Sequence, residues 1–80
     1  MAQQAQAPVM GPANATYEQR IQNALHNAGY YTGPIDGVIT EEVREAIKNF
    51  QKNNGLRSDG IAGRNTWHML KKYYVNQDDE

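Results

Sequence analysis

Apolar residues in the middle of the chain recur at the spacing of buried helix faces. The first such stripe comprises Tyr17, Ile21, Ala24, Leu25 and Ala28. Thr16, just before the stripe, and Gln19, within it, have the T-x-x-Q spacing of a capping box. In such a box the side chain of each residue forms a hydrogen bond with the backbone amide of the other. Gly29 follows the stripe, and glycine is the residue type that tolerates the positive φ at a helix end. The pattern predicts a helix between residues 16 and 29, with the whole stripe facing the core.

Two further helices are predicted downstream. The second runs from about Glu41 to Asn53, with Thr40 as its N-cap and Asn54-Gly55 as its stop signal. Its core face, at spacing i, i+3, i+4, i+7, consists of Val43, Ala46, Ile47 and Phe50. The third helix is expected to start near Arg64. It carries Thr66, Trp67, Leu70, Tyr73 and Tyr74.

Two similar Asp-Gly turns, each leading from a loop into a helix, form an internal half-repeat at an offset of 23 residues. The copies are Asp36-Gly37-Val38-Ile39-Thr40 and Asp59-Gly60-Ile61-Ala62-Gly63. An aspartate can accept hydrogen bonds from amides of its own turn, and this loop-fixing role is the expectation for both carboxylates. We expect Val38 and Ile61 to insert into the core. Because each carboxylate serves its own turn, the two are not expected to act as a catalytic pair.

Composition restricts the function classes. The chain has 80 residues, eight Lys plus Arg against nine Asp plus Glu, and no cysteine. One small, monomeric domain is therefore expected, without disulfides or cysteine zinc sites. The net charge is −1, whereas proteins that bind nucleic acid need an excess of Lys and Arg to neutralise phosphates. No nucleic-acid partner is therefore expected. No apolar stretch approaches the roughly 20 residues that span a bilayer, so no membrane insertion is expected.

The two ends of the chain differ from its middle. Residues 1–15 are rich in Ala, Gln, Pro, Gly and Asn and contain no charged side chain, which predicts a disordered linker. Residues 76–80 read as a frayed acidic tail. The folded domain is therefore expected to comprise residues 16–75.

An ordered set of residues carries a family resemblance. The set is Ile21-Gln22, Leu25, Gly29-Tyr30-Tyr31, Gly33, Ile35-Asp36-Gly37, Ala46-Ile47, Phe50-Gln51, Gly55-Leu56, Asp59-Gly60-Ile61, Gly63, Thr66-Trp67 and Leu70. It resembles the bacterial peptidoglycan-binding domain family over essentially all of residues 17–70. The family pattern usually has Gly and Thr where this chain has Thr40 and Val43. Any ligand contact by the first turn is therefore less secure than one by the second.

The resemblance implies an all-α three-helix bundle that binds peptidoglycan in the bacterial cell envelope, either periplasmic or extracellular. It implies no catalysis and no cofactor, and an attached domain anchored to the wall. Peptidoglycan consists of amino-sugar strands bridged by stem peptides rich in carboxylates and amides. Aromatic rings cover the C–H faces of sugars, whereas Arg and Asn side chains bind carboxylates. The candidate ligand-binding residues are Tyr30, Tyr31, Asp36, Arg64, Asn65 and Trp67.

Several alternatives stay open at this level. One ring of Tyr30 and Tyr31 is expected to pack inward and the other outward. His26 and His68 lack metal-ligand spacing, so no metal is expected, and Ser58 lacks the context of a nucleophile. Any catalytic machinery would then lie in other sequence. The main alternative function is a protein-interaction or regulatory domain on the same scaffold, and a stand-alone hydrolase is the least favoured.

Overall fold

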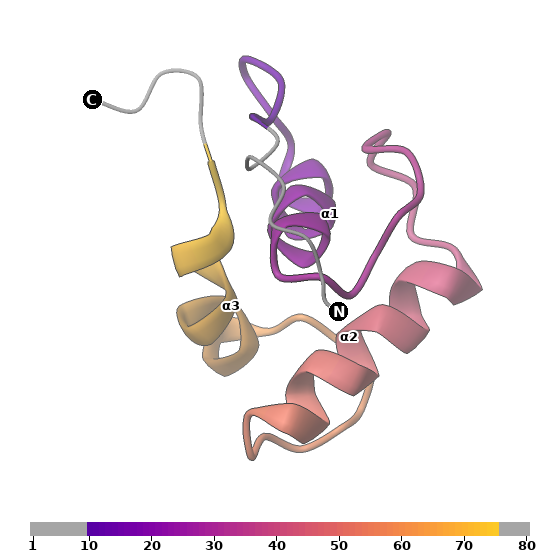
Figure 1. The fold of residues 1–80 in the computed structure, drawn as a ribbon, viewed down its shortest axis with the longest axis vertical. Helices are drawn as coiled ribbons and strands as arrows, with labels where there is room; N and C mark the ends of the chain where they lie inside the picture. Colours follow the sequence, from indigo (N-terminus) through magenta and orange to yellow (C-terminus); the bar gives the residue numbers. More distant parts are fainter. Residues whose placement is uncertain (1–9, 76–80) are drawn as a thin grey trace, which may run out of the picture.

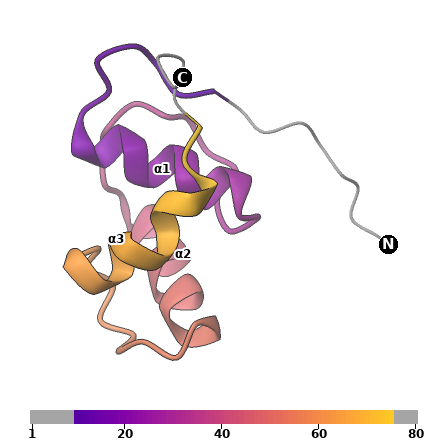
Figure 2. The ribbon, with the colours of Figure 1, turned by 90° about the vertical axis from the view of Figure 1, so that its left-hand side faces the viewer.

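The computed structural model describes residues 10–75, and within that part of the chain it contains three α-helices and one 3-10 helix. Helix α1 spans Tyr17–Asn27, α2 spans Glu41–Asn53 and α3 spans Arg64–Leu70, directly followed by the 3-10 helix η1 at Lys71–Tyr73. Helix α1 contacts α2, α3 and η1, so it joins the other helices into one bundle (Figures 1 and 2). This is the all-α three-helix architecture predicted from the sequence.

The predicted signals start and stop the first two helices. The Gln19 amide donates to Thr16 Oγ1 at 3.1 Å, and the Thr16 amide donates to Gln19 Oε1 at 2.9 Å, which completes the capping box. Helix α1 ends just before Gly29, whose φ is +90°. Thr40 Oγ1 accepts from the Val43 amide at 3.3 Å and caps α2. These local hydrogen bonds fix where each loop enters a helix.

The third predicted helix is divided in two. Helix α3 ends at Leu70, and the chain tightens into η1 over the next three residues. A 3-10 turn is a common way for a short α-helix to end. At the last residue of η1, the Tyr73 ring stands edge-on to Phe50, with ring centroids 6.3 Å apart. The tyrosines after Leu70 therefore contribute to packing without belonging to α3.

The core lies between the three helices and largely matches the predicted stripes. Its buried members are Ile21, Ala24, Leu25, Tyr31, Val43, Ala46, Ile47, Phe50 and Leu70. Ala28 and Tyr17 are exceptions, because Ala28 is only partly buried at the C-cap of α1 and 41% of Tyr17 is exposed. The Tyr17 ring stands edge-on to Trp67 at 5.6 Å, and its hydroxyl donates to the Ala62 carbonyl at 2.7 Å. The prediction that Tyr17 enters the core is wrong: its polar tip keeps the side chain across the junction of α1 and α3.

The described part of the predicted linker, residues 10–15, lies against the domain. The Gly11 amide donates to the Val75 carbonyl at 2.8 Å, and the Val75 amide donates to Asn23 Oδ1 at 3.0 Å. Ala15 is buried. The division of the chain at residues 16 and 75 stays a prediction, and the rest of the predicted linker and the acidic tail lie outside the described residues.

Candidate functional site

A buried glutamine from the preceding helix organises each Asp-Gly turn. Gln22 of α1 is fully buried. Its Nε2 donates to Asp36 Oδ1 at 3.1 Å and to the Val38 carbonyl at 3.0 Å. Its Oε1 accepts from the Gly37 amide at 2.7 Å. Gly37 has a φ of +82°, a conformation that L side chains rarely adopt. One side chain therefore holds three consecutive residues of the first turn.

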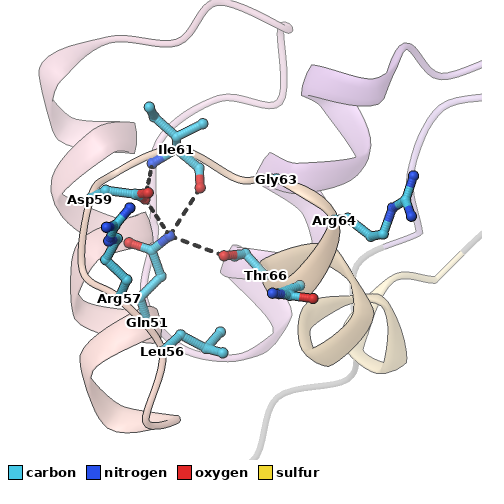
Figure 3. Close-up of a pocket in the computed structure, with 9 residues that line it drawn as sticks. Gln51, Leu56, Arg57, Asp59, Ile61, Gly63, Arg64 and Thr66 are labelled. Carbon is cyan, nitrogen blue, oxygen red and sulfur yellow. Dashed lines mark hydrogen bonds between the residues drawn. The ribbon is translucent and has the colours of Figure 1, made fainter.

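Gln51 of α2 repeats this arrangement atom for atom in the second turn (Figure 3). It is 1% exposed, and its Nε2 donates to Asp59 Oδ1 and to the Ile61 carbonyl, both at 2.9 Å. Its Oε1 accepts from the Gly60 amide at 2.9 Å. The repeated unit therefore comprises more than the Asp-Gly segment seen in the sequence. It also includes the buried glutamine of the preceding helix, which forms hydrogen bonds with the turn.

Both aspartates fix their own turns, as predicted. Asp36 Oδ1 accepts from the Val38 amide, and Asp59 Oδ1 accepts from the Ile61 amide, each at 3.0 Å. These amide bonds, followed by the glutamine bonds, lower the pKa of both carboxyls below the ordinary value of 3.8. Both side chains therefore carry a negative charge at neutral pH.

The expectation that Val38 and Ile61 insert into the core is wrong. Val38 is 56% exposed and Ile61 is 67% exposed. The amide of each residue is bound by the aspartate and its carbonyl by the glutamine. With both backbone groups turned inward, the side chain is left facing solvent. The residues that follow, Ile39 and Ala62, pack partly buried against the core instead.

The sequence analysis did not assign a role to either glutamine. A usable signal was present, since Ile21-Gln22 and Phe50-Gln51 each place a polar residue directly after a core position in the helix that precedes an Asp-Gly turn. A polar side chain with long reach is rarely buried without a fixed set of partners. The two dipeptides therefore indicate that each glutamine is buried and forms hydrogen bonds that hold the following turn.

In the second turn, the glutamine side chain has one hydrogen-bond acceptor more than in the first turn. Gln51 Nε2 also donates to Thr66 Oγ1 at 3.0 Å. The residue at the corresponding position of the first turn, 23 places earlier, is Val43, which is fully buried in the core. Thr66 is itself only 5% exposed. The two turns therefore share a backbone design but differ in polarity where each meets its following helix.

A pocket of about 520 Å³ opens beside the second turn and the start of α3 (Figure 3). It is lined by Gln51, Leu56, Arg57, Asp59, Ile61, Gly63, Arg64, Asn65 and Thr66. A second hollow of about 260 Å³ also includes Ile61, together with Tyr17 and Arg44. The exposed Ile61 side chain thus borders both hollows.

Two guanidinium groups and one carboxylate give the larger pocket its charge. Arg57 and Arg64 have no ion-pair partner among residues 10–75, where the two ion pairs present are Arg44–Glu41 and Lys48–Glu45. Figure 3 shows Arg57 beside Gln51 and Asp59, whereas Arg64 extends away from them. The pocket therefore carries an excess positive charge, and Arg57 is the cation nearest its polar wall.

The structure brings together only two of the six predicted ligand residues, Arg64 and Asn65. Trp67 is half-buried and packs between the rings of Tyr17 and Tyr74, at centroid distances of 5.6 and 6.0 Å. Asp36 is held in the first turn by Gln22, as described above. Arg57 was missed by the sequence analysis, although it stands two residues before Asp59 in the same loop.

The tyrosine pair is divided between core and surface. Tyr31 is buried, and its hydroxyl donates to the Pro34 carbonyl at 2.8 Å. Burial is the main cause that raises its pKa. Tyr30 is half-buried, edge-on to Phe50 at 5.6 Å, and its hydroxyl accepts from Asn53 Nδ2 at 2.8 Å. Tyr31 is therefore the inward ring, and neither tyrosine lines the pocket.

Two further properties of the described chain bear on the chemistry. Between residues 10 and 75, no three side chains among His, Asp and Glu gather closely enough to hold a metal ion. The helices in this part of the chain are also too short or too polar to cross a bilayer.

Comparison with known proteins assigns the fold to a family. Residues 19–70 match the family described as "Putative peptidoglycan binding domain", which is more than half of the chain. The chain belongs to the peptidoglycan-binding domain family. Membership supports peptidoglycan as the partner and association with the cell wall. No solved structure matches the chain significantly.

Three relatives illustrate where the domain occurs. A spore cortex-lytic enzyme of Bacillus cereus is 44% identical over 65% of this chain and 20% of its own length. The N-acetylmuramoyl-L-alanine amidase CwlM of Mycobacterium tuberculosis is 36% identical over 80% of this chain and 15% of its own. The localization factor PodJL of Caulobacter vibrioides is 37% identical over 84% of this chain and 7% of its own. The chain therefore corresponds to a small part of each relative.

Proposed function

We propose that this domain is a non-catalytic peptidoglycan-binding module that anchors an attached domain to the wall in the cell envelope. We also propose that the pocket beside the second Asp-Gly turn is its binding surface. The observation that carries the proposal is the meeting, in one pocket, of Arg57, Arg64 and Asn65 on a domain of this family. Guanidinium and amide groups bind the carboxylates and amides of which wall stem peptides are built.

The positions of the reactive side chains support a non-catalytic role. Asp36 and Asp59 are each engaged in their own turn. The Ser58 hydroxyl donates to the Lys48 carbonyl at 3.0 Å, and His26 Nδ1 lies 3.1 Å from the Tyr31 carbonyl. In the described residues, no serine–histidine pair or carboxylate pair faces the pocket. Binding and positioning are the functions that such a lining supports.

The relatives support a tethering role. In each of the three, the segment similar to this chain is at most a fifth of the protein, and one of them is named a localization factor rather than an enzyme. A module linked to another domain raises the local concentration of that domain on an insoluble polymer, even when its own affinity is weak. Weak, monomeric binding would therefore suffice for the proposed anchoring.

Cosedimentation with purified, protein-stripped sacculi tests the proposal. We expect the 80-residue chain to pellet with sacculi in a saturable way and to release no soluble wall fragments. The control is an unrelated acidic three-helix domain of similar size. Retention no greater than that of the control would overturn the binding proposal, and release of fragments would overturn its non-catalytic part.

The alternative drawn from the sequence, a protein-interaction or regulatory domain of the envelope, predicts a different outcome. Such a domain would form specific crosslinks to an envelope protein in cell extract while pelleting no better than the control with stripped sacculi. Running both assays on the same sample separates the two functions.

A further inference from the structure

We infer that the pocket beside the second turn takes a carboxylate of the stem peptide rather than a sugar, and that Arg57 is the residue that pairs with it. This inference rests on the proposed function and specifies which part of the wall polymer occupies the site. Four features of the described residues support it: the lack of aromatic lining, a cation that forms no ion pair, a buried hydroxyl, and the contrast with the first turn.

The lining of the pocket is unsuited to a sugar ring. Proteins commonly cover the C–H face of a sugar with an aromatic side chain, and none of the residues that line this pocket is aromatic. The half-buried rings of Tyr30 and Trp67 pack against other aromatic residues outside the pocket. The glycan strand therefore has no stacking platform here.

The charges of the pocket favour an anion. Asp59 brings the one carboxylate, and its Oδ1 is engaged by the Ile61 amide and Gln51 Nε2. Arg57 forms no ion pair among residues 10–75, although it lies beside this carboxylate (Figure 3) and its charge helps to lower the pKa of Asp59. A guanidinium can hold a carboxylate through two parallel hydrogen bonds, and its planar fork suits that geometry better than an ammonium does.

A buried hydroxyl adds a neutral donor to the same wall. Thr66 accepts a hydrogen bond from Gln51, which occupies a lone pair of Oγ1 and leaves its proton to donate. Among residues 10–75 the structure gives that proton no acceptor, and Thr66 is 95% buried where it lines the pocket. An oxygen atom of a ligand can therefore accept the hydrogen bond from the Thr66 hydroxyl. A carboxylate accepts from both Arg57 and Thr66 without having to supply a donor.

The first turn provides a comparison within the same molecule. At the positions 23 residues before Arg57 and Thr66 stand Pro34 and Val43. The first turn therefore has the same glutamine-held backbone but neither the cation nor the hydroxyl. If the backbone alone bound the ligand, both turns would bind it, and the stoichiometry would be two. The proposal predicts one site per chain.

The test uses isotope-labelled domain and a synthetic stem peptide with free carboxylates, titrated by NMR. We expect amide shifts around the second turn and α3, and a single site. Arg57→Gln should weaken binding about fivefold, the size of an exposed charge pair worth ~1 kcal/mol. Arg20→Gln removes the same charge from α1, outside the pocket, and should change affinity less than about twofold. Thermal unfolding of both variants checks that they fold.

A second peptide isolates the interaction. Converting the carboxylates to carboxamides should weaken binding to the wild type by a similar factor, and Arg57→Gln should then cause no further loss. Equal binding of both peptides, shifts confined to the first turn, or loss in Arg64→Gln with none in Arg57→Gln would overturn the inference.

Sacculi separate the failure of this inference from the failure of the proposed function. Amidase treatment removes the peptides and leaves glycan strands. If wild type and Arg57→Gln bind intact sacculi and bare glycan equally well, the inference is overturned while wall binding stands. If the wild type binds neither, the proposed function itself fails.

Discussion

Replacing Gln51 with leucine is the sharpest test of how the second turn is built. The two side chains are similar in size, so Gln51→Leu keeps the volume of the core while removing two N–H donors, which three acceptors share, and one carbonyl acceptor. The Gly60 amide, which is buried, loses its acceptor. The Ile61 carbonyl loses its side-chain donor. The substitution therefore removes the hydrogen bonds of the side chain without opening a cavity.

The expected loss follows from the hydrogen bonds. At about 1 kcal/mol each, the two N–H donors and the one carbonyl acceptor of Gln51 contribute ~3 kcal/mol, and leaving the buried Gly60 amide without an acceptor costs about 1 kcal/mol more. Burial of the apolar leucine side chain stabilises the folded state by about 1.5 kcal/mol and offsets part of this loss. The free energy of unfolding should therefore fall by about 2–3 kcal/mol. Since a domain of this size is stabilised by only about 3–5 kcal/mol, the variant should be close to its unfolding midpoint in water at 25 °C.

Urea unfolding followed by far-UV circular dichroism measures this loss. Gln22→Leu, which also removes two N–H donors and one carbonyl acceptor, should lose a similar amount. Asn49→Leu, on the exposed side of α2, controls for the leucine itself and should stay within about 0.5 kcal/mol of the wild type. A loss below about 1 kcal/mol for Gln51→Leu would refute the view that this glutamine organises the turn.

Three further predictions concern the core and the pH dependence. Phe50→Ala, at the centre of the core, should cost about 3–5 kcal/mol and abolish the cooperative thermal transition. Tyr31→Phe removes the hydroxyl that donates to the Pro34 carbonyl, so calorimetry should show a melting temperature lowered by roughly 4–8 °C for a loss of ~1 kcal/mol. Because hydrogen bonds lower the pKa of Asp36 and Asp59 in the fold, their stabilisation is present above the unfolded pKa near 3.8. It is lost as pH falls below that value, and Asp59→Asn should flatten this decline in urea midpoints measured from about pH 5 down to about pH 2.

The fold could be predicted because its signals are local. The capping box at Thr16, the Thr40 cap and the spacing of the α2 core residues each depend on neighbours within a few positions of the chain. Such signals agree with the helices they specify before any tertiary contact forms. The end of α3 was less predictable, because the chain continues past Leu70 into η1 without a glycine or proline to stop it.

The site was less predictable because it depends on partners far apart in the sequence. Ile61 is apolar and follows a turn, so an inward side chain was a reasonable expectation. It faces outward because Gln51, ten residues earlier, and Asp59 take both of its backbone groups. Arg57 gains its place in the pocket only when α3 packs beside the loop. Family resemblance indicated the ligand and favoured the second turn over the first, but it did not indicate Arg57 as a residue of the pocket.

The hydrogen bond between Gly11 and Val75 has a consequence for how such a module can be reused. The two ends of the described chain therefore lie side by side, and Figures 1 and 2 place them at the opposite end from the loop between α2 and α3. Adjacent exits let a domain be spliced into a surface loop of a host without stretching either junction. A gene rearrangement could thus move this unit to an internal position as readily as to a terminus, with the end that carries the proposed binding pocket still facing outward.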